Sequence, residues 1–327
     1  MFTPAKAQDL KHQIAWGAPD PLVQIKNYLT PDWVLEPKLD GVRMLVQLGT
    51  TANRMNSGRT SDVSGGYVER ADNFPHLRDA VQADWAGTLL DGELMPACGE
   101  DTLASVMSLV NSTPATATAI QQRQGNAVFM AFDVLAVQGV PVTHLPLRLR
   151  RELLEALIVH LHILDPSFQV ITQMPATTDN IFLCLDEGFE GAMLKRREGK
   201  YKAGARMSDW QKIKRYSAGD FYLIGAIPGK GRNAGKVGSM KVAYMNADRL
   251  TDVYCADVAG IDDAFRDEIT GPDGLLAPAW YGKVIEVMAQ GRTKNGRLRH
   301  PHFVRLRPDK TIYDCTPECS IDLFEEV

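Results

Sequence analysis

Long apolar runs are missing from this sequence. No stretch of its 327 residues approaches the roughly 20 consecutive apolar residues that cross a bilayer. The first residues also lack an apolar segment between a basic start and a small-residue cleavage site, so we expect no signal peptide. These absences argue against a membrane partner and predict a cytoplasmic location.

Cysteine pairs are missing as well. The chain has five cysteines, an odd number, and no Cys-x-x-Cys motif. Cys315 and Cys319 lie close together, but a structural zinc site needs further ligands at suitable spacing. An odd count without such motifs is typical of a reducing compartment. We therefore interpret the cysteines as free thiols.

A strong net charge is also absent, yet the charges are unevenly placed. The 36 basic and 40 acidic residues leave a net charge of −4. Residues 195–241 carry +10 and residues 290–310 carry +6, so the remainder carries −20. Two basic segments on an acidic body favour a surface that follows a polyanion. Solvated loops would give the same pattern, and charge alone does not decide between the two interpretations.

The composition, 45% hydrophobic and 23% charged, is that of a globular protein, and the length predicts two domains. Residues 34–48 predict two short strands around a turn at Asp40-Gly41. The segments 147–164 and 177–189 have the spacing of helices, the second with a Thr or Asp cap. Further strands are expected at 89–95, 127–137, 168–174, 190–196 and 209–215, with a basic loop over 197–208.

After Arg215 the pattern changes to short strands separated by Gly-rich turns. Such strands in succession suit a small β-barrel of the OB type. We place the boundary within 215–219, so the expected α+β architecture has a mixed domain over 1–217 and a barrel over 218–327. The barrel strands are expected at 220–227, 236–245, 251–260, 283–290 and 302–307.

Lys38 is the candidate nucleophile because it ends a predicted strand just before a tight turn. A free lysine has a pKa near 10.4, so holding its amine neutral at pH 7 costs about 4.6 kcal/mol. Nearby cations or burial reduce that cost. A surface lysine before a common turn would give the same short motif. The candidate cations are Arg43, Arg59, Lys212 and Lys214.

Other polar motifs could bind a metal or phosphates. Asp91 and Glu93 face the same way on a strand, so Glu93 would project as a polar contact or a metal ligand. Glu190 precedes a glycine, which leaves room for a metal-bound phosphate. Lys212 and Lys214 share one face of a strand and repel each other unless a phosphate chain lies between them.

Taken together, these motifs resemble those of the ATP-dependent DNA ligases. That family belongs to the covalent nucleotidyltransferases, with the mRNA capping enzymes and the RNA ligases. The resemblance covers nearly the whole chain and is greatest to the short ligases of short-tailed bacteriophages, through Glu36-Pro37 and the stretch 299–305. The motifs are Lys-x-Asp-Gly at 38–41, an Arg-containing loop at 56–59, Asp-Gly-Glu at 91–93, Phe132-Asp133, Glu-Gly-x-Met-x-Lys at 190–195 and Lys-x-Lys at 212–214.

The resemblance implies an adenylation domain over 1–217 and an OB-fold DNA-binding domain over 218–327. It implies an enzyme that seals nicks in duplex DNA during replication and repair, through lysyl-AMP and adenylylated DNA intermediates. The implied cofactors are ATP and Mg²⁺, with Mn²⁺ as an alternative. The implied partner is nicked double-stranded DNA, bound by a monomer in the cytoplasm, which is the host cytoplasm for a viral protein.

The resemblance also implies residue roles. Lys38 would attack the α-phosphate of ATP, while Glu93 and Glu190 would hold the metal. Phe132 would stack on adenine, although a core position is the simpler interpretation of this residue taken alone. The other AMP contacts would come from Glu36 at the adenine edge, Leu39, Asp40, Arg43, Arg59, Glu93, Lys212 and Lys214. The DNA contacts would come from Arg59, Lys230, Arg232, Lys236, Arg297 and Arg299.

Two features depart from simple patterns. The family usually shows Ser-Arg together, whereas this chain has Ser57-Gly58-Arg59, and Arg54 competes for the same role. The Gly-rich stretch 229–236 resembles a phosphate-binding loop but has the wrong glycine spacing, so we interpret it as a basic loop of the barrel. RNA ligation, GTP-dependent RNA capping and an inactive nick-binding protein remain alternative functions.

Overall fold

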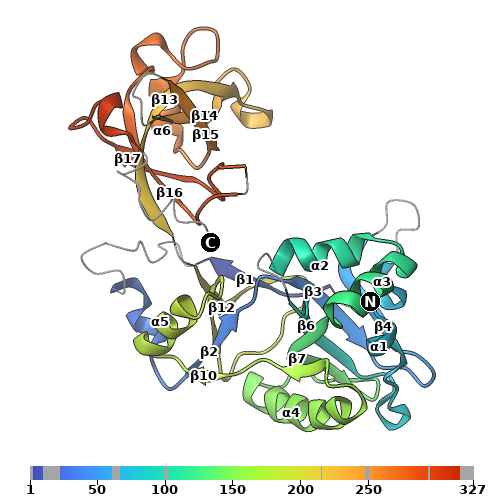
Figure 1. The fold of residues 1–327 in the computed structure, drawn as a ribbon. Helices are drawn as coiled ribbons and strands as arrows, with labels where there is room; N and C mark the ends of the chain where they lie inside the picture. The colour runs from blue at the N-terminus through green and yellow to red at the C-terminus, as the bar shows by residue number, and fades with distance from the viewer. Residues whose placement is uncertain are drawn as a thin grey trace. The chain divides into compact units, whose positions relative to one another are not determined.

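The computed structural model describes residues 3–9, 23–60, 67–98, 102–214, 216–246, 251–293 and 295–316, without the side chains of 8–9, 23–24 and 58–60. The chain divides into two compact units (Figure 1). Unit 1 comprises Met1–Lys11 and Gln24–Ile213, and unit 2 comprises His12–Val23 and Lys214–Val327. Within the described residues, no helix is long and apolar enough to cross a membrane.

Unit 1 is built on two sheets. The first is five-stranded, in the order β1-β12-β11-β2-β10. Its strands are β1 (Lys6–Asp9), β2 (Trp33–Lys38), β10 (Met174–Pro175), β11 (Gly191–Arg196) and β12 (Arg206–Lys214). The second is seven-stranded, in the order β5-β4-β3-β6-β7-β8, with β9 beside β7. Its strands are β3 (Val42–Gln47), β4 (Arg54–Thr60), β5 (Tyr67–Glu69), β6 (Leu89–Met95), β7 (Val128–Val137), β8 (Val140–Pro141) and β9 (Phe168–Val170).

The turn at Asp40-Gly41 joins the two sheets. The two expected strands around it are confirmed as β2 and β3, but they belong to different sheets and do not pair with each other. A side chain at position 41 would place its Cβ atom 2.4 Å from the carbonyl oxygen of Leu94 and 2.9 Å from Cγ of Glu93. Only glycine therefore allows the chain to pass this close to β6.

The helices of unit 1 cover the sheets. The longest, α4 (Leu147–Leu164), begins and ends at the residues that its spacing predicts, and it contacts β7 and β9 through buried leucines such as Leu154 and Leu161. Thr177 caps α5, as expected, by accepting a hydrogen bond from the backbone of Asn180. The others are α1 (Pro75–Asp79), α2 (Thr102–Asn111), α3 (Pro114–Gln124) and α5 (Thr178–Asp186).

One expected strand is wrong. The segment 168–174 is not continuous, because β9 ends at Val170 and β10 begins at Met174. The first part pairs with β7 in the seven-stranded sheet, and the second pairs with β2 in the five-stranded sheet. The chain crosses from one sheet to the other here, so its middle residues cannot remain in either ladder.

Unit 2 contains one five-stranded sheet in the order β15-β14-β13-β16-β17. Its buried core includes Phe221, Val242 and Val287. The short helix α6 (Asp263–Ile269) follows β15. The expected α+β architecture, with an OB-type unit after the mixed unit, is confirmed. The strands are β13 (Ser217–Pro228), β14 (Val237–Met245), β15 (Asp252–Val258), β16 (Val284–Ala289) and β17 (His302–Leu306).

Candidate active site

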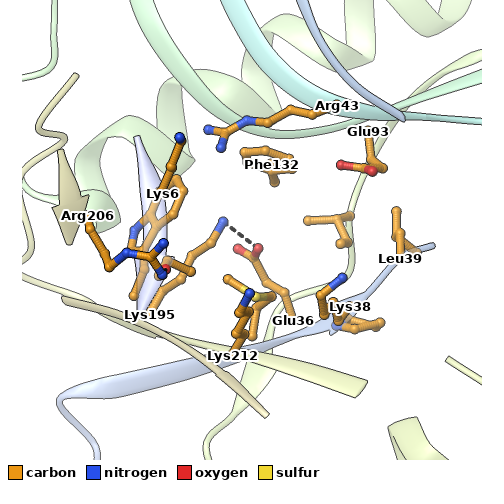
Figure 2. Close-up of a pocket in the computed structure, with 15 residues that line it drawn as sticks. Lys6, Glu36, Lys38, Leu39, Arg43, Glu93, Phe132, Lys195, Arg206 and Lys212 are labelled. Carbon is orange, nitrogen blue, oxygen red and sulfur yellow. Dashed lines mark hydrogen bonds and ion pairs between the residues drawn. The ribbon is translucent and has the colours of Figure 1, made fainter. Parts of the chain in front are cut away.

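A cavity of about 300 Å³ in unit 1 is lined by residues of both sheets, and we call it the Lys38 pocket (Figure 2). Seven candidate residues from the sequence line it: Glu36, Lys38, Leu39, Arg43, Glu93, Phe132 and Lys212. Residues to which the sequence analysis assigned no role also line it: Lys6, Ala7, Pro37, Ile171, Met193, Lys195, Arg206 and Trp210. Asp40 and Lys214 are not among the lining residues. The side chain of Arg59 lies outside the described part of the chain.

Lys38 lies at the end of β2, opposite Gly191 of the neighbouring strand β11. This register brings Glu190, the residue before β11, next to the lysine. The Lys38 ammonium forms an ion pair with the Glu190 carboxylate, and the two side chains are 20% and 12% exposed. The amine therefore has to leave this carboxylate before its lone pair can attack phosphorus.

Glu93 lies on β6, opposite Arg43 of β3, and both side chains enter the Lys38 pocket. Burial raises the pKa of Glu93 to about 7, although the nearby charges of Lys38 and Arg43 oppose the shift. The side chain therefore titrates near neutral pH in the nucleotide-free protein. A bound cation would favour its charged form.

The raised pKa of Glu93 leads to a prediction about the stability of the nucleotide-free protein. Unfolded Glu93 titrates near its ordinary value of 4.5 and the folded group near 7, so its contribution to stability is present below pH 4.5 and is lost as pH rises through 7. Glu93→Gln should therefore unfold with a free energy up to about 3 kcal/mol above that of the parent at pH 8.5, and this gain should shrink towards pH 4.5. Urea unfolding of the nucleotide-free protein at several pH values measures this difference. The matched control is Glu187→Gln, at an exposed glutamate after α5, and a gain for Glu93→Gln that is the same at every pH would contradict the prediction.

Hydrogen bonds to Asp91 and to the backbone of Ala5 fix the position of Arg43. Its guanidinium donates two hydrogen bonds to the fully buried Asp91, from Nε to Oδ1 at 2.9 Å and from Nη2 to Oδ2 at 2.5 Å. Burial raises the pKa of Tyr201, so its hydroxyl keeps its proton and donates to Oδ2 of Asp91 at 2.7 Å. Arg43 also donates to the backbone carbonyl of Ala5. This network fixes the cation and ties the segment before β1 to the pocket.

Phe132 enters the Lys38 pocket because β7 contains a β-bulge. The register between β6 and β7 passes from Gly92–Ala131 to Asp91–Asp133, which leaves Phe132 without an opposite residue. Its ring meets the buried Trp210 edge-on, with ring centroids 6.1 Å apart. An aromatic surface thus faces the cavity, and the stacking of adenine on Phe132 stays a prediction.

A buried ion pair lies beside these rings. Nζ of Lys195 is 2.5 Å from Oε2 of Glu36, and both side chains are 2% exposed (Figure 2). Gln173 donates to the other carboxylate oxygen of Glu36 at 3.1 Å. The same lysine nitrogen lies 4.5 Å from the ring centroids of Phe132 and Trp210. The contacts with Lys195 and Gln173 therefore hold the Glu36 carboxylate in one orientation. Lys195 belongs to the Glu-Gly-x-Met-x-Lys motif, so that motif was the available signal for it.

The donor set is compatible with Mg²⁺. Glu93 and Glu190 lie near each other, since the charge of Glu190 contributes to raising the pKa of Glu93. No group of three or more His, Cys, Asp or Glu suited to a metal is found among the described residues. Mg²⁺ is usually held by one or two carboxylates plus water and substrate phosphates. The carboxylates of Glu93 and Glu190, together with water and substrate phosphates, would therefore suit this ion.

The surface residues predicted to bind DNA were also located. Arg54 is 73% exposed and pairs with Glu69, outside the Lys38 pocket. In unit 2, Lys230 and Arg232 are exposed in the loop between β13 and β14. Lys236 pairs with Asp267, the guanidinium of Arg297 lies 4.0 Å from the ring centroid of Tyr254, and Arg299 is half-buried.

Comparison with known families identifies the chain. A model of the ATP dependent DNA ligase domain matches residues 19–214, which is more than half of the sequence. The chain belongs to the ATP-dependent DNA ligase family. A second model, of the DNA ligase OB-like domain, matches residues 228–307 of this ligase family member. The recognised family and the expected fold are thereby confirmed.

The relatives agree with this assignment. A DNA ligase of Hyperthermus butylicus is 27% identical, over 84% of this chain and 53% of that protein. A multifunctional non-homologous end joining DNA repair protein LigD of Mycobacterium tuberculosis is 27% identical, over 85% of this chain and 36% of that protein. The chain spans about half the length, or less, of these curated relatives.

Solved ligase structures share the fold. The ligase domain of M. tuberculosis LigD aligns with a TM-score of 0.52 at 23% identity, covering 96% of this chain and 97% of that one. A structure from work on Lig E DNA ligases aligns with a TM-score of 0.62 at 22% identity, covering 94% of this chain and all of that one. At such identities the likeness concerns the fold alone.

Proposed function

We propose that this protein is an ATP-dependent DNA ligase that seals nicks between a 5′-phosphate and a 3′-hydroxyl in duplex DNA. The observation that carries the proposal is Lys38, which ends β2 inside a pocket that also contains cations, two acidic side chains and an aromatic ring. Membership of the ligase family supports the same activity. Residues 1–217 would perform adenylation and residues 218–327 would bind DNA.

The reaction would proceed in three steps. The Lys38 amine would form a bond to the α-phosphorus of ATP while the bond to pyrophosphate breaks. The 5′-phosphate of the nick would then take the AMP, and the 3′-hydroxyl would finally displace it. Arg43 and Lys212 would hold phosphate oxygens, and a divalent cation at Glu93 and Glu190 would neutralise charge on the phosphates. Holding that cation would give the Glu190 carboxylate an alternative partner to Lys38.

The buried Glu36–Lys195 pair supports ATP rather than GTP as the substrate. Adenine presents a hydrogen-bond donor, its 6-amino group, beside the acceptor N1 on its Watson–Crick edge. The Glu36 carboxylate accepts hydrogen bonds and the Lys195 ammonium donates them. The pair therefore presents an acceptor beside a donor, which is complementary to the Watson–Crick edge of adenine. Guanine presents the opposite arrangement, and it would leave buried polar groups unpaired.

The surface charges support the DNA partner. Basic side chains that neutralise phosphates release counterions, so binding would weaken steeply as salt rises. The residues proposed for this role are Arg59, Lys230, Arg232, Lys236, Arg297 and Arg299. Arg59 would contact the 5′-phosphate at the nick.

A monomer would suffice, because no step above needs a second subunit. Roles in replication as well as repair, a bacteriophage source and a cytoplasmic location remain predictions.

Intact mass spectrometry tests the proposal. The protein is incubated with Mg²⁺ and either ATP or GTP, and then with nicked DNA. We expect a gain of one AMP with ATP only, which disappears as sealed DNA forms. A gain with GTP would indicate RNA capping, and sealing of nicked RNA in preference to DNA would indicate an RNA ligase. Protein that is neither loaded as purified nor able to gain AMP would instead be an inactive nick-binding protein.

A further inference from the structure

Gln173 lies where the chain crosses from one sheet of unit 1 to the other. The next residue, Met174, begins β10 and pairs with Leu35 of the antiparallel strand β2. One step further along this register, Gln173 comes opposite Glu36. Its side chain donates a hydrogen bond from Nε2 to Oε1 of Glu36 at 3.1 Å, across 137 positions of sequence. No motif of the ligase resemblance includes Gln173.

Hydrogen bonds on both sides of the crossing fix the position of Gln173. The backbone N–H of Ile171 donates to the carbonyl of Ala131 in β7 at 2.9 Å. The carbonyl of Ile171 accepts from Nη2 of Arg151 in α4 at 2.7 Å, in a buried contact. Strand β10 pairs with β2 directly after the crossing. The backbone of Gln173 therefore has little freedom to move away from Glu36.

Gln173 lies outside the Lys38 pocket and is not among the residues that line it. It lines a second cavity of unit 1, of about 460 Å³, together with residues such as Trp33. A base bound in the Lys38 pocket would meet Glu36 and Lys195, which line that pocket. Gln173 would therefore act on the base only through Glu36.

The Glu36 carboxylate needs two contacts to keep one orientation. Lys195 contacts one of its oxygens, as Figure 2 shows. An ammonium group is a compact charge with rotatable donors, and the torsion that turns a glutamate carboxylate is broad. Lys195 alone would thus leave the plane of the carboxylate free to turn, and the planar amide of Gln173 at the other oxygen fixes it. Each oxygen can accept a second hydrogen bond, so this plane decides where an acceptor points in the pocket.

We infer that Gln173 is a positioning residue for the selection of adenine. By fixing the plane of the Glu36 carboxylate, it directs an acceptor oxygen at the 6-amino group of the base. The effect concerns this one hydrogen bond, and neither the phosphates nor the attack by Lys38 depends on it. The inference rests on the proposed ligase function, in which ATP loads Lys38, and adds to it a residue outside the nucleotide pocket.

A nucleotide that lacks the 6-amino group tests the inference. Purine riboside triphosphate keeps N1, the acceptor for Lys195, but carries hydrogen in place of the amino group. The variant is Gln173→Met, which keeps the length of the side chain and removes the donor, with Gln173→Ala as a second variant should the first be unstable. The matched control is Gln169→Met on β9, where the side-chain amide donates to the backbone carbonyl of Pro166 at 3.3 Å.

Single-turnover loading of Lys38 from each nucleotide is followed by intact mass, at concentrations that give the ratio of kcat/KM for ATP over the analogue. We expect the parent protein to prefer ATP by at least about tenfold, and Gln173→Met to reduce this preference by about tenfold. A factor of ten is near the lower end of the value of one hydrogen bond to a charged group. The loss should lie in loading from ATP, whereas loading from the analogue should match that of the parent.

A loss confined to ATP would support the positioning role, because a merely structural defect would slow both nucleotides alike. Equal slowing with both nucleotides would overturn the inference, and so would a preference for ATP as large as that of the Gln169→Met control. A parent protein that loads both nucleotides equally well would also overturn it, because Glu36 would then not read the amino group. A parent protein that loads neither nucleotide, and is not already loaded as purified, would instead contradict the proposed function.

Discussion

Lys38→Ala should abolish AMP loading, with a loss of about 10⁴-fold or more in the rate of that step. Lys38 ends β2 beside Glu190 and lines the Lys38 pocket, and no other amine occupies this position. Covalent catalysis cannot proceed without its nucleophile. Intact mass after incubation with ATP and Mg²⁺ measures the loading.

Two controls distinguish lost chemistry from lost structure. Lys38→Arg keeps a cation next to Glu190 but lacks the nucleophilic amine, so it should also fail to load AMP. Both variants should still bind nicked DNA and should retain sealing of DNA that already carries AMP, because that step does not use the lysine amine. If Lys38→Ala still gains AMP, the assigned nucleophile is wrong.

Asp133→Ala should destabilise unit 1 by about 3–5 kcal/mol. Asp133 accepts two hydrogen bonds from Arg150, at 2.7 and 2.8 Å, and both side chains are fully buried. Arg150 also donates to the backbone carbonyls of Leu145 and Gly199. The substitution leaves a buried guanidinium charge without its carboxylate. Urea unfolding of the parent and the variant measures the loss.

A matched substitution on the surface sets the scale. Asp72 pairs with Arg78 at 2.9 Å, but its side chain is 68% exposed, so Asp72→Ala should cost less than about 1 kcal/mol. Replacing both buried partners by apolar residues, as in Asp133→Leu with Arg150→Met, should recover much of the loss. If Asp133→Ala costs no more than Asp72→Ala, the buried pair does not stabilise the fold as argued.

The sequence determined the element types and the order of the motifs. Helical spacing predicted α4 over 147–164, and a strand was expected over 89–95, where β6 lies, both with the bounds that the structure has. These signals are local, because periodicity depends on which face of an element is buried. The order of the motifs also predicted the ligase family, and the match over residues 19–214 confirms it.

The sequence also supplied most of the residues around the pocket, although their roles remain predictions. Glu36, Lys38, Glu93 and Phe132 were predicted from motifs, and all of them line the cavity. Lys6 was not predicted, because its strand pairs with residues some 200 positions later in the chain. No local pattern marks such a neighbour.

Only the tertiary structure decided how these residues face one another. It separated β2 from β3 into different sheets, divided 168–174 between them, and turned Phe132 into the cavity through a bulge. It also buried Lys195 against Glu36 and placed Glu190 against Lys38. Each of these outcomes depends on strand register between distant segments. The register is fixed by packing and by the pairing of buried charges, which a local sequence pattern does not encode.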